Sequence, residues 1–123
     1  MADPRHALGA AAEHLVERWL TGAGWIVMDR RRRPTGGGEV DLLAQDPDGV
    51  LVAIEVRARR SGRAGSAAGS VSARHVTRLR RSLGVLASEN GIRARGMRVD
   101  LVSVEPAGGV PGAWRVTRTP DVG

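Results

Sequence analysis

A turn at residues 46–49, with the sequence Asp-Pro-Asp-Gly, constrains the fold more than any other feature of this chain. Proline fixes φ and glycine accepts a positive φ, so these residues favour a tight reversal of the backbone. The stretches on either side, residues 39–44 and 50–57, are rich in Val, Leu and Ile and are predicted strands. The sequence therefore predicts a β-hairpin, whose two strands are antiparallel.

The length of the loop in this hairpin decides which side chains share a face. In a three-residue loop at residues 47–49, with a type I turn and a left-handed glycine, Asp41 lies opposite Glu55. The same register places Glu39 opposite Arg57. A two-residue loop would shift the register by one and direct the two carboxylates to opposite faces. The Pro-Asp-Gly sequence favours the three-residue loop.

The remaining elements follow from hydrophobic periodicity. Apolar residues recur at helical spacing over residues 6–20 and again over residues 72–90, which predicts two amphipathic helices. Apolar runs at residues 25–28, 97–104 and 113–117 predict strands, the last of them a weaker edge strand. A strand that returns after a helix can lie parallel to its neighbour. The predicted fold class is therefore α/β, a mixed β-sheet flanked by helices in the order α-β-β-β-α-β-β.

The length of 123 residues predicts a single domain over residues 1–123, because a second core would leave each half too small to be stable. Residues at about 60–71 are almost all Gly, Ser, Ala and Arg, and we expect a mobile loop there. No segment approaches the roughly 18 apolar residues of a membrane span, and no leader peptide is recognisable. We expect a cytoplasmic protein.

The charge of the chain points to a polyanionic partner. The net charge is +6, and all 19 basic residues are arginine. Such a field concentrates nucleic acid, with a basic protein that lacks this partner as the alternative. We expect phosphate contacts, largely independent of base sequence, from three groups of arginines. They are the run at residues 30–33, then Arg59, Arg60 and Arg63 after the hairpin, and Arg74, Arg78 and Arg81 on the polar face of the second helix.

The pairing of Asp41 with Glu55 calls for a compensating cation, because like charges directly opposite each other destabilise a sheet by up to about 1 kcal/mol. Hard oxygen ligands suit Mg²⁺ or Mn²⁺, which can polarise a phosphoryl oxygen and lower the pKa of a bound water. A ladder of salt bridges, in which Arg57 and other arginines neutralise the acids, is an equally good interpretation of the spacing. Both remain open.

The stretch Gly-Glu-Val-Asp-Leu-Leu at residues 38–43, followed after the turn by Ile-Glu-Val-Arg at residues 54–57, resembles the YraN-like family of predicted nucleases. The pattern in that family is GEIDLI followed by VEVK and a basic tail, and the resemblance extends from Leu8 to about Val104. It implies a restriction-endonuclease-like fold and metal-dependent hydrolysis of DNA phosphodiesters. The alternative is a non-catalytic module that binds nucleic acid and has a degenerate active site.

By this resemblance Asp41 and Glu55 are the metal-binding acids, and Arg57 occupies the position of the catalytic lysine. Lysine can orient or deprotonate a water, whereas arginine, with a pKa above about 12, supplies only positive charge. Whether the chain is an enzyme therefore stays open at the level of sequence.

Two further acids and two histidines complete the candidates. Glu13 corresponds to a helix acid that can approach the metal in related nucleases, although the helical count favours a solvated side chain. Glu39 either binds the metal through water or, slightly favoured, pairs with Arg57. His14 and His75 have no partner at ligand spacing, so we expect both at the surface.

Overall fold

The structure, a computed structural model, describes residues 4–59 and 71–122, with side chains from residue 9 onward. The loop expected at about 60–71 therefore lies outside the described residues except for its last member. That residue, Val71, packs against the apolar core beneath the second helix.

The described residues form the elements predicted, in the predicted order. The helices and strands are α1 (Pro4–Gly22), β1 (Ile26–Arg32), β2 (Val40–Gln45), β3 (Leu51–Ala58), α2 (Ala73–Glu89), β4 (Met97–Pro106) and β5 (Trp114–Thr119). β1 extends beyond the predicted apolar run through Arg32, because its last residues pair with the start of β2. Pairing with a neighbouring strand, and not local hydrophobicity, determines where β1 ends.

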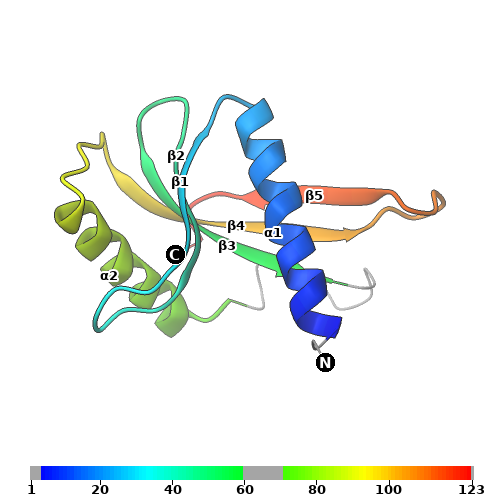
Figure 1. Cartoon of the computed structure of the whole chain (residues 1–123), viewed down its shortest axis with the longest axis horizontal. Coiled ribbons are helices and arrows are strands. Elements are labelled where there is room, and N and C mark those ends of the chain that lie inside the picture. Colours follow the sequence, from blue (N-terminus) through cyan, green and yellow to red (C-terminus); the bar gives the residue numbers. More distant parts are fainter. Residues whose placement is uncertain (1–3, 60–70, 123) are drawn as a thin grey trace.

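The strands form one mixed sheet in the order β1-β2-β3-β4-β5 (Figure 1). β3 and β4 are parallel and are connected through α2, and the other neighbouring pairs are antiparallel. β1 and β5 are the two edge strands. The α/β class and the mixed sheet predicted from sequence are thus confirmed.

The hairpin of β2 and β3 has the three-residue loop. Gln45 pairs with Leu51 and Leu42 pairs with Ile54, the register in which Asp41 lies opposite Glu55. Asp46 closes the loop, since its N–H donates to the Val50 carbonyl at 2.9 Å.

Helices cover both faces of the sheet (Figure 1). α1 packs on one face, where Val16 and Leu20 contact a core that includes Ile54. α2 packs on the other, where Leu79 and Leu83 belong to a second core with Val40, Leu43, Leu51, Ala53 and Val99. Because strand side chains alternate between faces, Asp41 and Glu55 share the face of Leu43 and Ala53 and lie on the α2 side.

A buried hydroxyl fastens α2 to the glycine-rich connection between β1 and β2. Ser82 is fully buried, and its Oγ donates to the Gly38 carbonyl at 2.7 Å. Gly37 lies so close that a Cβ there would be 2.3 Å from Ser82 Oγ. Only glycine allows this approach, so the helix and the start of β2 are held together.

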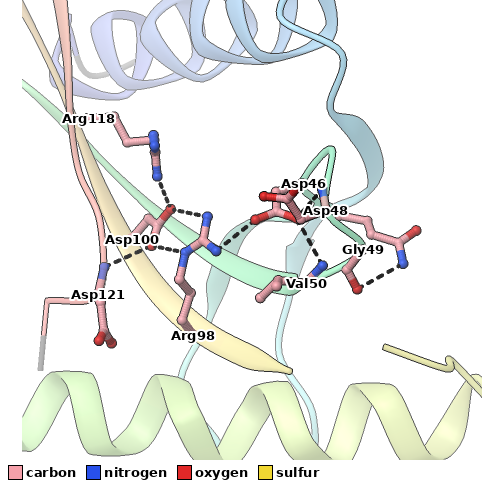
Figure 2. Close-up of polar contacts among 9 residues, drawn as sticks. Asp46, Asp48, Gly49, Val50, Arg98, Asp100, Arg118 and Asp121 are labelled. Atoms are coloured by element: carbon pink, nitrogen blue, oxygen red, sulfur yellow. Dashed lines mark hydrogen bonds and ion pairs between the residues drawn. The ribbon is translucent and has the colours of Figure 1, made fainter. Parts of the chain in front are cut away.

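A buried ionic cluster joins the turn, β4 and the C-terminal segment on the α1 face (Figure 2). Asp100 is 0% exposed and accepts from Arg98 Nε at 2.8 Å, Arg118 Nη1 at 2.9 Å and the Asp121 N–H at 3.0 Å. Arg98 also donates to Asp46 at 2.7 Å. Both guanidinium groups lie over the ring of Trp25, at 5.6 and 5.3 Å from its centroid. Asp100 is therefore shared by two partly buried cations, of which Arg98 has Asp46 as a second partner.

Asp100→Asn should lower the free energy of unfolding by about 3–5 kcal/mol, because it leaves the partly buried Arg118 without a described carboxylate and Arg98 with Asp46 alone. Denaturant unfolding measures this change. Glu89→Gln on the exposed end of α2 is the control and should stay within about 0.5 kcal/mol. A loss for Asp100→Asn no larger than that of the control would contradict this role.

Candidate functional site

Asp41 and Glu55 lie next to each other on the α2 face of the hairpin. Asp41, near the start of β2, is partly buried, and its Oδ2 accepts from the Val56 N–H on β3 at 2.9 Å. Glu55 precedes that residue and is only 6% exposed. The carboxylate of Asp41 thus replaces a backbone acceptor at the end of the β2–β3 ladder, and this places its charge beside that of Glu55.

A cavity of about 210 Å³ opens over this pair of acids. The hairpin, the β1–β2 connection and α2 each contribute to its wall. The charged and titratable lining residues are Arg33, Glu39, Asp41, Glu55, His75 and Arg78. The structure therefore brings three of the predicted acids to one opening, together with two arginines and a histidine.

Glu55 is held between two nitrogen-bearing side chains. Arg57 Nη2 lies 3.2 Å from Glu55 Oε1, and His75 Nε2 lies 3.3 Å from Glu55 Oε2. Arg57 is on the same strand as Glu55, two residues on, and it neutralises this acid. The expected pairing of Arg57 with Glu39 was wrong.

The two outer acids have other arginine partners. Glu39 pairs with Arg33 of the β1–β2 connection at 3.7 Å. Glu13 on α1 pairs with Arg31 at 2.9 Å and is 19% exposed, so it is not the freely solvated acid that the helical count favoured. Both differences arise because β1 and the connection after it carry arginines past α1 and the start of β2, a contact that sequence spacing does not reveal.

His75 was the site residue that sequence reasoning missed. It was expected to be a surface histidine, but its side chain is 30% exposed and its buried Nε2 has no hydrogen-bond partner in the described part of the chain. The available signal was its place next to Val76 in the apolar stripe of α2, which puts it on the flank that meets the sheet. His14, by contrast, is exposed as predicted.

Asp41 differs from its neighbours in having no cationic partner within the described residues. Burial raises the pKa of Asp41 to about 7, and the charge of Glu55 adds to the effect. The hydrogen bond from the Val56 N–H opposes the rise, whereas Glu13 and Glu39 contribute to it. A carboxylate in this state attracts a proton or a cation.

The three groups of predicted basic residues differ in their partners. The four arginines at residues 30–33 all pair with described carboxylates. Arg59 follows β3, and its backbone N–H donates to the Val104 carbonyl at 2.8 Å, while Arg60 and Arg63 lie outside the described residues. The others are exposed along α2, and no described carboxylate lies within ion-pair distance of them: Arg74, Arg78 and Arg81. Because Arg78 also lines the cavity, this stripe reaches the acidic site.

Neither a preassembled metal site nor a membrane-spanning helix occurs in the described residues. No three or more His, Asp or Glu side chains in residues 4–59 and 71–122 are arranged to hold a metal ion as they stand. No helix in those same residues is long and apolar enough to cross a membrane.

These features define a small α/β protein with a mixed five-stranded sheet, an acid-lined cavity on one face and an arginine stripe along the helix beside it. The chain belongs to the Uncharacterised protein family UPF0102, which it matches over residues 12–104. This is the YraN-like family that the motif at residues 38–43 and 54–57 resembles, so the recognition from sequence is confirmed.

Relatives in this family match most of the chain. A UPF0102 protein of Kineococcus radiotolerans is 41% identical over 101 residues, which cover 81% of this chain and 81% of the relative. One from a Nocardioides species is 39% identical over 100 residues, covering 81% and 79% of the two chains. A third, from Burkholderia thailandensis, is 39% identical over 104 residues, covering 85% and 71%.

The raised pKa of Asp41 predicts a pH-dependent stability. A carboxyl whose pKa is about 7 when folded and 3.8 in the unfolded chain contributes stability that is full below the lower value and is lost as the pH rises through the upper one. In EDTA, the free energy of unfolding should therefore decline between about pH 4 and pH 7, and Asp41→Asn should flatten this decline.

Denaturant unfolding at several pH values measures both slopes. Asp48→Asn, an exposed acid in the turn, is the control and should retain the slope of the unmodified protein. An equal slope in Asp41→Asn would show that Asp41 is ionised throughout this range.

Proposed function

We propose that this protein is a metal-dependent nuclease of restriction-endonuclease-like fold that hydrolyses DNA phosphodiesters. One observation carries the proposal: Asp41 and Glu55 meet on one face of the sheet, at a cavity bordered by an arginine stripe that has no carboxylate partner among the described residues. Metal-dependent hydrolysis of a phosphodiester uses acids that hold a divalent metal ion, next to basic side chains that bind phosphates. The motif at residues 38–43 and 54–57 supports the same function by resemblance.

The donors in the cavity suit Mg²⁺ or Mn²⁺. Such ions are often held by one or two carboxylates, with waters completing the coordination, so a preassembled set of three protein ligands is not required. Asp41 has no cation partner among the described residues, and its burial and the charge of Glu55 disfavour its ionised form. Asp41 and Glu55 would hold the ion. The charges of Glu39 and Glu13, which act on Asp41, would also influence the ion.

A bound divalent cation would supply positive charge to a phosphoryl oxygen and to the attacking water. The chain's own residues contribute position and charge. Arg57 is a fixed cation beside Glu55, and it cannot accept a proton from water because its guanidinium stays charged. Arg78 at the cavity wall and Arg74 one turn away would bind phosphates near the reacting bond.

The contact between Arg57 and Glu55 also favours a second candidate, a nucleic-acid-binding module with a degenerate site. An arginine that already neutralises one of the two acids reduces the demand for a metal ion. The two candidates share the binding surface and differ in whether the bound strand is cut. A cleavage assay separates them.

Cleavage should require a divalent cation and Asp41. Single-stranded, duplex and branched DNA are incubated with the protein in Mg²⁺, Mn²⁺ or EDTA, and products are resolved on a denaturing gel. We expect cleavage in at least one metal and none in EDTA. Asp41→Asn should fall to the EDTA level, because the amide keeps the shape of the side chain and removes the charge that holds the metal.

Two variants make this assay decisive. Asp48→Asn is matched in chemistry, lies in the exposed turn, and should cut normally. Arg57→Lys restores a side chain that can exchange a proton and should preserve or raise the rate. Cleavage that survives both EDTA and Asp41→Asn would refute the metal mechanism, and binding without cleavage by the unmodified protein would favour the second candidate.

DNA binding should weaken as salt rises, with each phosphate contact contributing about 0.9 to the slope of log affinity against log salt. Arg78→Glu should lower the affinity and reduce that slope by about one contact, and Arg74→Glu and Arg81→Glu should act similarly. Fluorescence anisotropy over a salt series measures both quantities. Arg18→Glu, exposed on α1 across the sheet, is the charge-matched control. Equal losses in Arg18→Glu and Arg78→Glu would place the DNA elsewhere.

A further inference from the structure

Two potential ligand atoms from different elements already lie side by side in the cavity. His75 Nε2 on α2 is 3.3 Å from Glu55 Oε2 on β3. Nε2 is buried, and the contact does not have the geometry of a hydrogen bond. Two ligand atoms at right angles around one ion, each about 2.1 Å from it, are about 3 Å apart. The separation of these two atoms therefore suits neighbouring positions on one cation with little movement of either side chain.

Asp41 lies at the same opening and becomes a third donor if its side chain turns toward the other two, since the three are not arranged to hold an ion as they stand. It lines the cavity together with Glu55 and His75. No described arginine or histidine pairs with it, and the charge of Glu55 opposes its ionisation. A metal ion bound among the three side chains would relieve the repulsion between the two acids and would accept His75 Nε2 as a ligand.

We propose that His75 is a metal ligand through Nε2, together with Asp41 and Glu55, and that this nitrogen makes the site prefer Mn²⁺ to Mg²⁺. Mg²⁺ selects oxygen ligands and keeps its waters, whereas transition metals accept imidazole readily. The two carboxylates admit both ions, so the histidine decides between them. This inference rests on the proposed function, since it assigns a further ligand to the same metal site.

The competing explanation of the contact is an ion pair between a protonated His75 and Glu55. Such a pair would fasten α2 to the sheet and would make no distinction between Mn²⁺ and Mg²⁺. The two explanations therefore differ in metal selectivity, which can be measured without any nuclease assay.

Isothermal titration calorimetry of the full chain with Mn²⁺ alone and with Mg²⁺ alone tests the proposal. His75→Gln should weaken Mn²⁺ binding by at least about 10-fold, the lower end of what even an outer-shell substitution costs. Mg²⁺ binding should change little, because its oxygen ligands are untouched. His14→Gln, exposed on α1, is the matched control and should bind both ions as the unmodified protein does.

His75→Cys provides a positive test, because the unmodified chain contains no cysteine and any thiolate signal would come from residue 75. A thiolate in the place of the imidazole favours soft metals, so this variant should gain affinity for Cd²⁺. The bound ion should also give an ultraviolet thiolate charge-transfer absorption that disappears in His75→Cys/Asp41→Asn. A role in packing alone predicts neither the gain nor the absorption.

The outcomes separate this inference from the proposed function. If Asp41→Asn binds neither ion while His75→Gln loses affinity mainly for Mn²⁺, the inference is supported. If Asp41→Asn loses both and His75→Gln keeps the selectivity of the unmodified protein, His75 is not a ligand, and the metal site on the two acids stands. If the unmodified protein binds neither ion, both proposals fail. Circular dichroism establishes that each variant is folded, and His75→Cys replaces His75→Gln should the latter not be.

Discussion

The turn between β2 and β3 is the constraint on which the rest of the site depends. Asp46 Oδ1 accepts from the N–H groups of Asp48 and Val50, both at 2.9 Å, and its Oδ2 accepts from Arg98 (Figure 2). Burial alone would raise the pKa of Asp46, but these hydrogen bonds from Val50, Arg98 and Asp48 hold it below its ordinary value. Gly49 completes the loop at φ 87°, a conformation that few other residues adopt. One residue more or fewer would reverse the face of every side chain in one strand.

The two faces of the sheet resolve the same electrostatic problem in opposite ways. On the α1 face, Asp100 is completely buried, and two arginines and a backbone N–H satisfy it. On the α2 face, Glu55 is nearly as buried, but Asp41 beside it has no cation within the described residues. The first arrangement is closed and holds strands together. The second leaves a carboxyl group without a balancing cation at an opening, where a ligand can approach it.

The parallel crossover through α2 makes the second arrangement possible. Ser82 and Gly37 bring the helix close to the start of β2, and the apolar residues around Leu79 press it onto the sheet. At that position the helix presents His75 to Glu55 and Arg78 to the cavity. The same helix therefore supplies part of the core, one wall of the site and the exposed cations beside it.

The order of the elements, the hairpin register and the shared face of Asp41 and Glu55 could be predicted from sequence, because periodicity and turn geometry act between residues near in the chain. The partners of Glu13, Glu39 and Arg57 could not, since long side chains pair with whichever charge the folded chain brings nearest. The tertiary fold also brings His75 into the site. Helical periodicity predicts which stripe of a helix is buried. Whether a side chain at the edge of that stripe meets the sheet or the solvent depends on how the helix docks. The docking of α2 in turn depends on contacts between residues distant in sequence.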